Sequence, residues 1–541
     1  MAQQSSQNTT AKPRSEESTK EVFESIIIAL ILAFVFRAYV VEAFIIPTGS
    51  MAPTLLGAHA EIVCQQCGYR FTTDWPTSRP AILGRPHEAI CPMCRFNNPL
   101  PAGSVPRAGD RILVQKYLYS FQEPERWDVM VFKYPEDPQN FNYIKRLVGL
   151  PNEQLYIFEG NLFVRPLDPD TGEPAGPWRI ARKAERPEAQ RAVWQPVYHS
   201  QYVPLDEGRT GAGPRRWNWS VPWRPVRAAE AWDLENQRQY RYAGDGRGTL
   251  RYRFRQPGGR QGLGSSGWAA GFMGRMFPYN QFKKNRPSAG TIEEIRLAAT
   301  VVPEQTGTTA ALATTARLEG APETITASID ASGTLRLTAR DGERLLGEYD
   351  ASPLEAGRGS RLELWYVDHT LMVWFDGDPV IEHRVDLTLD ELIARPDARD
   401  LPEITLSVGG PATLHRVELD RDLYYTHRSV QSELAQGTLL PRGPRGPRGE
   451  PVTLGPDEFF AMGDNSPFSH DSRFWAGVED WVAYHVWEQD PDIAGIESKP
   501  GVVPRELVMG RAFFVYFPAL YPWKNHHRGV LPNFGQMRFI H

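Results

Sequence analysis

The stretch Gln154-Leu-Tyr-Ile-Phe158, with the turn Glu159-Gly160-Asn161 and then Leu162-Phe-Val164, indicates the kind of fold that this chain adopts. Two short runs of aliphatic and aromatic residues flank a turn that contains Gly and Asn, which is the pattern of a β-hairpin. Similar strand-like segments occur on both sides of it: Arg111–Gln115, Asp128–Tyr134, Tyr143–Val148, Glu458–Met462 and Val508–Tyr516. Because the last two come only near the end of the chain, the sequence predicts a β-domain that is split by long insertions.

The composition agrees with a mainly β fold of several domains. The chain has 541 residues, and Gly and Pro number 46 each, which favours loops and strands. At about 150 residues per domain, a chain of this length holds three or four domains. The net charge of −5 gives no general attraction to nucleic acid, so no nucleic-acid partner is expected.

The pattern along the chain predicts its domain organisation. Short alternating strands such as Arg361–Val367 and Thr370–Phe375 predict an antiparallel β-sandwich. We expect a polar tail (1–21), a transmembrane anchor (22–41), three parts of a catalytic domain (42–57, 107–164 and 453–541), a zinc-ribbon-like insertion (58–106), a Trp- and Arg-rich insertion (165–289), the β-sandwich (290–425) and a linker of Pro-Arg-Gly repeats (426–452).

The long apolar run near the N-terminus predicts the membrane anchor. Ser25–Phe36 alone is short for a span of roughly 20 residues. Residues 22–41 suffice if Arg37 extends its side chain to the interface. The alternative is a cleaved signal peptide, which is disfavoured by the mixed-charge polar lead and by the lack of a small-x-small pair after the run.

Ser50 lies on a constrained turn just beyond this run. In Ile46-Pro-Thr-Gly-Ser-Met-Ala-Pro-Thr-Leu55, Pro47 and Pro53 fix φ, and Gly49 permits conformations that other residues resist. A serine beside a glycine is usually only a turn residue, so Ser50 becomes a candidate nucleophile only together with a base.

Lys145 is the candidate base. Its strand neighbours Ile144, Leu147 and Val148 are apolar, which predicts that one side of the strand is buried. A solvated lysine has a pKa near 10.4, whereas desolvation favours the neutral amine. Arginine cannot be deprotonated, so a lysine at this place, in a chain with ten lysines and fifty arginines, is typical of a base. The alternative is an ordinary strand lysine that points to water.

A third polar segment follows a predicted strand near the end of the chain. Gly463-Asp-Asn-Ser-Pro-Phe-Ser-His-Asp-Ser-Arg473 has the composition of a tight turn. Asp471 and Arg473 are spaced to form an ion pair that fixes the loop. A generic polar loop is the alternative interpretation.

Taken in order, these segments resemble the type I signal peptidases, membrane-bound Ser/Lys endopeptidases that remove signal peptides from exported proteins. The motifs that carry the resemblance are Pro47–Leu55, Gly109–Lys116, Asp128–Lys133, Tyr143–Pro151 and Gly463–Arg473. The resemblance implies the family's β-rich catalytic fold and catalysis without a cofactor.

The resemblance also implies roles for individual residues. Ser50 would be the nucleophile and Lys145 the general base, and the Ser50 N–H with the Thr48 hydroxyl would form the oxyanion site. Ser469 would position the lysine amine, and Asp471 with Arg473 would brace the loop. The chain departs from the family at Thr48, where Ser is commoner, and at Ser466-Pro-Phe468, where many members have Arg-Asp-Asn.

The expected substrates are exported preproteins with small residues at P1 and P3. By resemblance, a set of mostly apolar side chains lines the shallow pockets that accept them: Phe44, Ile46, Leu55, Tyr143 and Ile144. Since Ser50 follows the apolar run closely, we expect a single-pass protein of the cell (inner) membrane, in contact with the lipid bilayer. Its N-terminus would be cytoplasmic and its catalytic body would lie on the outer, periplasmic face.

Two Cys-x2-Cys pairs lie in the insertion between Ser50 and Gly109. Cys64 with Cys67 and Cys91 with Cys94 have the spacing of a zinc ribbon, in which two tight turns supply four thiolates. A structural zinc ion is therefore predicted. A pair of disulfides is the alternative, which an extracytoplasmic location would favour.

The predicted sandwich leaves a second function open. Leu371–Gly377 and Ser407–Gly410 look like parts of concanavalin- or laminin-G-like domains, which often bind carbohydrate, so a glycan or protein ligand is conceivable. The chain would then be a membrane-tethered binding protein with an inactive peptidase core. A self-cleaving Ser/Lys repressor is a third alternative, but it requires a helix-turn-helix before the serine.

Overall fold

The computed structural model describes residues 15–75, 88–100, 106–205, 219, 221–253, 279–281, 292–318, 321–394, 402–426, 451–487, 499–518, 521–522, 529–531 and 533–541. Strands dominate these parts of the chain, so the prediction of a mainly β fold is confirmed. Most of the predicted tail (1–21) and nearly all of the predicted linker (426–452) lie outside the described residues.

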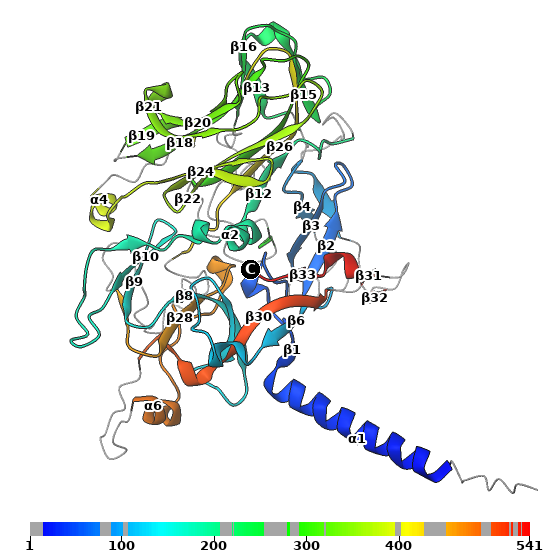
Figure 1. The fold of residues 1–541 in the computed structure, drawn as a ribbon, viewed down its shortest axis with the longest axis vertical. Coiled ribbons are helices and arrows are strands. Elements are labelled where there is room, and N and C mark those ends of the chain that lie inside the picture. Colours follow the sequence, from blue (N-terminus) through cyan, green and yellow to red (C-terminus); the bar gives the residue numbers. More distant parts are fainter. Residues whose placement is uncertain are drawn as a thin grey trace, which may run out of the picture.

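The first sheet is assembled from both ends of the chain. Its strands lie in the order β1 (Val41–Ile45), β6 (Arg111–Gln115), β30 (Val508–Phe517), β7 (Val129–Lys133), β8 (Asn142–Gly149), β28 (Glu458–Met462) and β29 (Val503–Pro504), with β33 (Arg538–Phe539) beside β30. β30 comes from the C-terminal part and lies between β6 and β7. Figure 1 shows β30 beside β6. This sheet is therefore complete only when segments from before and after the insertions have come together.

The sequence of the central strands explains their position. β7 and β28 consist almost wholly of aliphatic and aromatic residues and are buried on both faces. Alternate residues of β7 enter different hydrophobic clusters: Val129 and Val131 pack with Ile46 and Met51, whereas Met130 and Phe132 pack with Trp475. The sheet thus has a core on each face.

A smaller sheet and three hairpins accompany the first sheet. The smaller sheet has the order β11 (Arg179–Ile180), β10 (Asn161–Pro166), β9 (Glu153–Phe158) and β27 (Val452–Leu454). Its β9–β10 hairpin is the one predicted from the sequence. The other hairpins are β2 (His59–Val63) with β3 (Arg70–Asp74), β4 (Glu88–Ile90) with β5 (Asn97–Pro99), and β31 (Tyr521–Pro522) with β32 (Gly529–Leu531).

The long insertion contributes two large antiparallel sheets. One has the order β14 (Trp232–Asp233), β15 (Gln239–Tyr242), β26 (Ala412–Arg421), β17 (Ile295–Pro303), β22 (Ser360–Val367), β23 (Thr370–Phe375) and β24 (Asp378–Arg384), with β12 (Gln195–His199) beside β26. The other has the order β13 (Trp223–Arg227), β16 (Arg247–Tyr252), β25 (Ile404–Gly409), β18 (Thr309–Leu318), β19 (Ala321–Ile329), β20 (Thr334–Ala339) and β21 (Arg344–Asp350).

Both large sheets contribute to one hydrophobic cluster. It contains Leu297 and Leu364 from one sheet and Leu312 and Leu406 from the other. Strands β12–β16 belong to these sheets, so part of the predicted Trp- and Arg-rich insertion (165–289) folds together with the segment predicted as the sandwich (290–425). In Figure 1 the two sheets lie at the end of the molecule opposite α1.

The helices are few and mostly short. The α-helices of the described chain are α1 (Ser15–Tyr39), α2 (Pro187–Val193), α4 (Leu389–Ile393) and α6 (Asp480–Trp487). The 3-10 turns are η1 (Gly49–Met51), η2 (Leu118–Ser120), η3 (Lys183–Glu185), η4 (Ala229–Ala231), η5 (Arg340–Gly342), η6 (Ser466–Phe468), η7 (Arg505–Leu507) and η8 (Phe534–Gln536).

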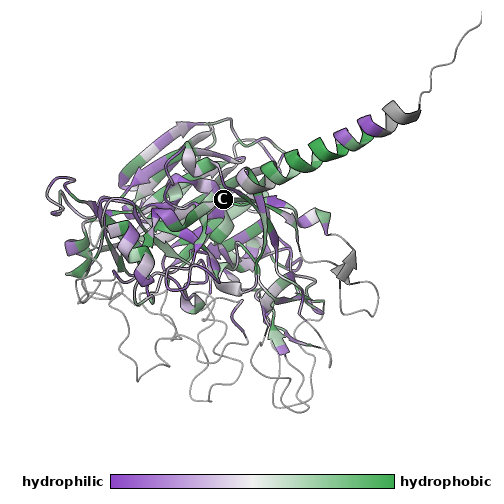
Figure 2. Ribbon diagram, turned by 90° about the horizontal axis from the view of Figure 1, so that it is seen from below, coloured by the Kyte–Doolittle hydropathy of each residue, from purple (hydrophilic) through white to green (hydrophobic). Residues whose placement is uncertain are grey.

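α1 projects from the body of the protein, and its middle is apolar (Figure 2). Among the helices of the described residues, however, none has the length and apolar character needed to cross a membrane. The structure therefore gives no support to the transmembrane anchor predicted over 22–41 or to its single-pass orientation. The helix also begins earlier than predicted, because Ser15–Glu21 contains no glycine or proline that would interrupt it.

Candidate active site

Ser50 is held on η1, which begins a few residues after the end of β1. Its side chain is buried, and its carbonyl oxygen accepts a hydrogen bond from the Asn465 N–H at 3.0 Å. Gly463 packs against the same carbonyl: a Cβ atom at this glycine would lie 2.4 Å from the Ser50 oxygen. The loop after β28 therefore approaches the serine backbone at a distance that only glycine permits.

The Lys145 side chain on β8 reaches the Ser50 hydroxyl. Nζ of Lys145 donates a hydrogen bond to Oγ of Ser50 at 2.9 Å and another to the Ile144 carbonyl at 3.1 Å. The lysine is only 4% exposed. A serine hydroxyl and a buried amine, 95 residues apart in sequence, thus lie within hydrogen-bonding distance.

Burial makes the neutral amine of Lys145 accessible near physiological pH. Desolvation lowers the pKa of Lys145 from 10.5 to about 8. The charge of Asp471 raises this pKa and the charge of Arg473 lowers it, so the two partly offset one another. The lysine can therefore lose its proton and act as a base at a pH where a solvated lysine stays charged.

Asp471 and Arg473 form a fully buried ion pair next to the lysine. The guanidinium donates two hydrogen bonds, from Nε to Oδ1 at 2.8 Å and from Nη2 to Oδ2 at 2.7 Å. Although burial opposes ionisation, the Arg473 charge holds the pKa of Asp471 below its usual value. Asp471 also accepts a hydrogen bond from the Gly463 N–H at 2.9 Å, which fixes the loop that packs on Ser50.

Ser469 lies on the same loop and is completely buried. Its Oγ would be 2.2 Å from a Cβ atom at Gly463. The hydroxyl is near enough to Asp471 to help lower the pKa of that carboxyl, yet it has no hydrogen bond of good geometry within the described residues. The hydrogen bonds of the Lys145 amine go instead to Ser50 and Ile144.

The remaining predicted site residues lie in different surroundings near Ser50. Oγ1 of Thr48 lies 3.5 Å from Oγ of Ser50. Four residues proposed to line substrate pockets belong to or pack against one hydrophobic cluster: Phe44, Ile46, Leu55 and Ile144. Two of these four, Ile46 and Leu55, are buried. Tyr143 instead packs beside Phe132 and Trp475, with its ring stacked on Tyr134.

A second buried ion pair next to the site was not predicted. Arg146 donates from Nε to Oδ1 of Asp464 at 2.7 Å and from Nη2 to Oδ2 at 2.8 Å, and Thr54 Oγ1 donates to the same carboxylate. The pair connects β8, which carries Lys145, to the loop after β28 and to the segment after Ser50. Adjacency of Arg146 to Lys145, and of Asp464 to Gly463, was the only sequence signal for it.

Ser466, at a position where the chain departs from the family, is also part of this loop's support. Its Oγ accepts hydrogen bonds from Arg473 Nη1 at 3.0 Å and from the Thr426 N–H at 2.9 Å. Thr426 comes shortly after the last strand of the two large sheets. The position at which the chain differs from the family, Ser466, is therefore in contact with the segment that ends the insertion.

The four cysteines converge in the β2–β5 region. Their sulfur atoms lie within 4.8 Å of one another, and all four are free thiols. The two pairs have matching local structure: Gly68 N–H donates to the Cys64 carbonyl at 2.9 Å, and Arg95 N–H donates to the Cys91 carbonyl at 3.0 Å. Gly68 and Arg95 both have positive φ values, 73° and 66°. The region thus contains two equivalent tight turns whose thiols face each other.

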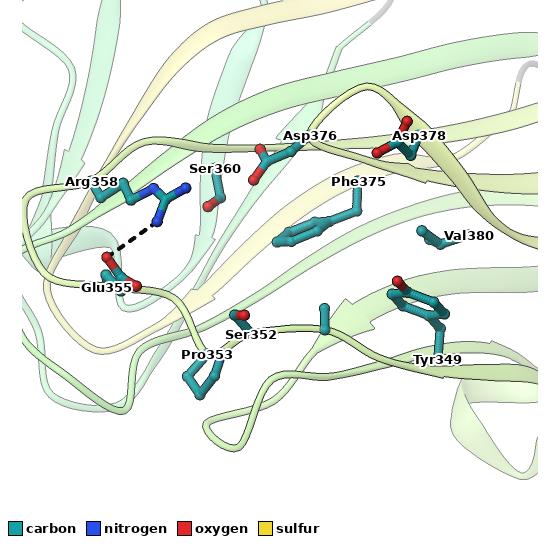
Figure 3. Close-up of a pocket in the computed structure, with 11 residues that line it drawn as sticks. Tyr349, Ser352, Pro353, Glu355, Arg358, Ser360, Phe375, Asp376, Asp378 and Val380 are labelled. Atoms are coloured by element: carbon teal, nitrogen blue, oxygen red, sulfur yellow. Dashed lines mark hydrogen bonds and ion pairs between the residues drawn. The ribbon is translucent and has the colours of Figure 1, made fainter.

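A separate pocket lies in the two large sheets. It has a volume of about 240 Å³. Figure 3 shows the rings of Tyr349 and Phe375 and the carboxylates of Asp376 and Asp378 around it, with the Arg358–Glu355 pair at one end. Trp365 on β22 and Trp374 on β23, by contrast, are buried. None of the residues that line this pocket belongs to the segments around Ser50 and Lys145.

A serine on a tight turn and a desolvated lysine within hydrogen-bonding distance define a candidate site of the serine–lysine hydrolase class. The family model "Signal peptidase, peptidase S26" matches residues 104–208 and 423–517. Signal peptidase I of Pseudomonas aeruginosa is 30% identical over 166 residues, which are 28% of this chain and 40% of that protein. Signal peptidase I of Rickettsia felis is 25% identical over 158 residues, 29% of this chain and 47% of that protein. The chain is similar to the type I signal peptidases over these segments.

The relatives match only part of this chain and only part of their own length. The matches span less than half the length of either curated relative. Solved structures with some likeness include the carbohydrate-binding module CBM66 from Bacillus subtilis, with 12% identity, a TM-score of 0.22, and coverage of 37% of this chain and 96% of that chain. The Emp46p carbohydrate recognition domain has 11% identity, a TM-score of 0.25, and coverage of 42% and 97%. At TM-scores this low, neither likeness bears on function.

Proposed function

We propose that the chain is a serine endopeptidase that removes N-terminal signal peptides from exported preproteins by means of a Ser50–Lys145 dyad. The observation that carries the proposal is the 2.9 Å hydrogen bond between the buried Lys145 amine and the Ser50 hydroxyl. The family match supports the same chemistry. No cofactor is needed for this reaction.

In the proposed mechanism, the neutral Lys145 amine accepts the proton of Ser50 as Oγ attacks the scissile carbonyl carbon. The negative charge on the carbonyl oxygen is stabilised by the Ser50 N–H and the Thr48 hydroxyl, worth about 3–4 kcal/mol per donor. The protonated amine gives its proton to the leaving amine nitrogen, which breaks the peptide bond. Water, deprotonated by the same amine, then hydrolyses the acyl-enzyme and restores both groups. Asp471, Arg473 and Ser469 are expected to keep the amine in place.

The substrate peptide is proposed to bind as an additional strand. Among the described strands, β1 is an edge strand that pairs only with β6, and the first residues of β8 pair with β7 but not with β28. Both leave backbone groups available near Ser50 for an extended peptide. Phe44, Tyr143 and Ile144, which are half-buried, would contact the small residues at P1 and P3, with Ile46 and Leu55 beneath them.

The proposal includes contact with a lipid bilayer through α1. Between Val22 and Val35 its large apolar side chains are exposed. The helix projects from the body of the protein (Figure 2). Flotation of the full chain with phospholipid vesicles tests this contact, and Ile27→Asp with Ile31→Asp should abolish it. A chain that stays in the soluble fraction with vesicles present would refute it.

The four cysteines are proposed to hold a structural zinc ion. Thiolates bound at about 2.3 Å to one tetrahedral zinc stand about 3.8 Å apart. The Cys64–Cys94 and Cys67–Cys91 sulfur distances of 3.5 Å fit this arrangement closely. Zinc would fix the two turns relative to one another. Metal analysis should find one zinc per chain, whereas no zinc and no free thiols would favour the disulfide alternative.

The second candidate function is that of a binding protein whose peptidase core is inactive. The pocket around Tyr349 and Phe375 favours it, because an exposed aromatic ring beside carboxylates suits a sugar or a peptide. We interpret the two large sheets as a concanavalin- or laminin-G-like sandwich that serves as an accessory domain. An inhibitor that acylates serine separates the two candidates, since it should modify Ser50 only in an active peptidase.

The decisive experiment is cleavage of a preprotein with an Ala-x-Ala site by the full chain in detergent. The wild type should cleave after the second alanine, and Ser50→Ala and Lys145→Ala should each lower kcat by at least about 10³-fold. Asp350→Asn, at the exposed end of β21, serves as a control and should keep full activity. Retained activity in Ser50→Ala or Lys145→Ala would remove the dyad.

A further inference from the structure

Three residues of the long insertion, Tyr279–Gln281, lie between the Ser50 turn and the cysteine region. Tyr279 and Asn280 are buried, as is Gln281. They are more than 200 positions from Ser50 in sequence, and outside the family match. Their hydrogen bonds reach two parts of the protein, and we call them the 279–281 bridge.

One end of the bridge holds the loop that supports the nucleophile. Asn280 Nδ2 donates to Oδ1 of Asn465 at 2.7 Å, and Asn465 Nδ2 donates back to Oδ1 of Asn280 at 2.8 Å. Asn465 in turn donates from Nδ2 to the Gly49 carbonyl at 2.9 Å and from its backbone N–H to the Ser50 carbonyl at 3.0 Å. The reciprocal amide pair therefore fixes Asn465, whose side chain holds the carbonyl before Ser50 and whose backbone N–H holds the Ser50 carbonyl.

The Tyr279 ring fixes the same turn from another side. A Cβ atom at Gly49 would lie 2.5 Å from Oη and 2.8 Å from Cε1 of Tyr279. The ring therefore packs directly on the Gly49 backbone, which cannot move toward it. Tyr279 and Ala52 also share one hydrophobic cluster, so the ring is itself held against the segment that follows Ser50.

The other end of the bridge is attached to the two cysteine hairpins. Gln281 pairs with Ile90 in both directions, since the Ile90 N–H donates to Oε1 at 2.6 Å and Nε2 donates to the Ile90 carbonyl at 2.8 Å. Ile90 directly precedes Cys91. The Tyr279 carbonyl accepts hydrogen bonds from the Asp74 N–H and the Thr73 hydroxyl, both at 2.8 Å. The bridge thus contacts β3 of one hairpin and β4 of the other.

We propose that Asn280 is a positioning residue for Ser50, and that the 279–281 bridge makes the activity of Ser50 depend on the ordered, metal-loaded state of the four-cysteine region. The inference rests on the proposed peptidase function and adds a form of control to it. When the thiols release their metal, the two turns lose a common anchor, and Gln281 and Tyr279 lose the fixed partners that hold Asn280. Asn465 then no longer has a fixed partner, and the Ser50 turn becomes less ordered.

The first test compares variants at the two ends of the bridge. Asn280→Ala removes the amide pair with Asn465, and Gln281→Ala removes the attachment to Ile90. Both should lower kcat by about 10- to 100-fold with KM changed less than about 2-fold, because they disturb orientation rather than substrate binding. Gln190→Ala is the matched control: it removes an equally buried amide, bonded to Asp422 at 2.6 Å, and should leave kcat unchanged. Unchanged kcat in Asn280→Ala, or an equal loss in Gln190→Ala, would overturn the inference.

The second test removes the metal with a chelator and adds zinc back. Chelation should lower kcat of the wild type to the level of Gln281→Ala, while Asn280→Ala should lose little further activity, since its bridge is already broken. Deuterium exchange gives a readout besides activity: the Asn465 amide, bonded to the Ser50 carbonyl, should exchange faster after chelation. Equal losses of activity in wild type and Asn280→Ala, or unchanged exchange, would contradict the coupling.

These readouts separate the inference from the proposed function. If the zinc-loaded wild type fails to cleave any preprotein, the proposed function is wrong, but faster Asn465 exchange on chelation would still support the bridge. If cleavage is efficient and neither kcat nor exchange responds to chelation, the proposed function stands and the bridge is refuted.

Discussion

At the residue scale, the proposed mechanism depends on the protonation state of Lys145. An amine buried this deeply costs more to charge than one in water, and its pKa falls to about 8. Nζ donates a hydrogen bond to the Ser50 hydroxyl. After the amine loses one proton, its nitrogen can accept a hydrogen bond from the same hydroxyl. The lysine and serine therefore exchange roles along an existing hydrogen bond rather than by rearrangement.

The pH dependence of cleavage follows from this pKa. The free base is the active form, so kcat/KM should be low well below pH 8, rise through an apparent pKa of about 8, and level off above it. A pH–rate profile of the full chain measures this. Lys145→Arg is the control and should be inactive at every pH, because a guanidinium is not deprotonated in proteins. A rise centred near 10 would mean that the amine is solvated.

Sequence reasoning identified the residues with local signatures. Ser50, Lys145, Asp471 and Arg473 all lie in short motifs with unusual composition, and the structure brings the four together. Asn280 could not be found in this way, because nothing in its neighbourhood marks a buried amide with a partner 185 positions away. The residues of the proposed dyad lie in short local motifs, whereas the contacts that support them join segments that are far apart in sequence.

At the scale of elements, β8 and the loop after β28 are connected by the Arg146–Asp464 pair. Both side chains are 1% exposed or less, and Arg146 also donates to the Trp127 carbonyl at 2.7 Å. The pair holds the strand that carries Lys145 against the loop that carries Gly463, so that the positions of the base and of the Ser50 backbone depend on each other.

Removing one partner of this pair should destabilise the protein strongly. Asp464→Asn leaves the Arg146 charge buried without its counterion, and we expect a loss of about 3–5 kcal/mol in the free energy of unfolding. Urea unfolding monitored by tryptophan fluorescence measures it. Asp457→Asn is the control: its pair with Arg505 is exposed and should contribute less than about 1 kcal/mol. A loss for Asp464→Asn as small as for the control would show that the buried charge is otherwise stabilised.

The positions of the strands in the sequence were largely predictable, but which strands pair with one another was not. Segments such as Val129–Lys133 and Glu458–Met462 are strand-like by composition alone, and both are strands. Their order in the sheet depends on which edges meet after long insertions, which local pattern does not encode. For the first helix, hydropathy correctly indicated an apolar segment, but it did not establish that the helix crosses a membrane.

At the scale of the whole molecule, a buried charge cluster joins the two large sheets to the rest of the protein. Lys183 on η3 lies 2.9 Å from Oδ1 of Asp368 and 3.2 Å from Oδ2 of Asp422. Glu294 is close to both carboxylates and accepts a hydrogen bond from Asn161 at 3.1 Å. Burial and the charges of Asp422 and Asp368 raise the pKa of Glu294. The junction is therefore held by a lysine among three acidic groups.

Replacing this lysine should weaken the junction in a pH-dependent way. Lys183→Met leaves the carboxylates without their cation, and we expect about 3–5 kcal/mol of destabilisation at neutral pH. The deficit should shrink as the pH falls, because the raised pKa of Glu294 lets it take up a proton and relieve the repulsion. Urea unfolding at a series of pH values measures this. Lys20→Met, in an exposed pair on α1, is the control and should have almost no effect. A deficit that is the same at every pH would contradict the explanation.

The presence of an insertion was evident from the sequence, whereas its integration into the catalytic part was not. Alternating strands between residues 290 and 425 predicted additional sheets, and the described strands there form two. Nothing in the local sequence indicated that Thr426 and Tyr279 contact the supports of the Ser50 turn. Nor did it indicate that Lys183 pairs with Asp368 and Asp422 at the junction, because these contacts form only when distant segments dock.

The central position of β30 has a consequence for how the protein is made. β6 and β7 are not adjacent in the sheet until a strand near the C-terminus has been inserted between them. At roughly 5–20 residues per second, the ribosome needs on the order of 20–80 s to proceed from Lys133 to Phe517. For most of that interval the nascent chain contains both residues of the proposed dyad but not the complete sheet that aligns them. If the proposed function is right, the Ser50–Lys145 pair can be aligned only after β30 has been made, so shorter nascent chains should not cleave preproteins.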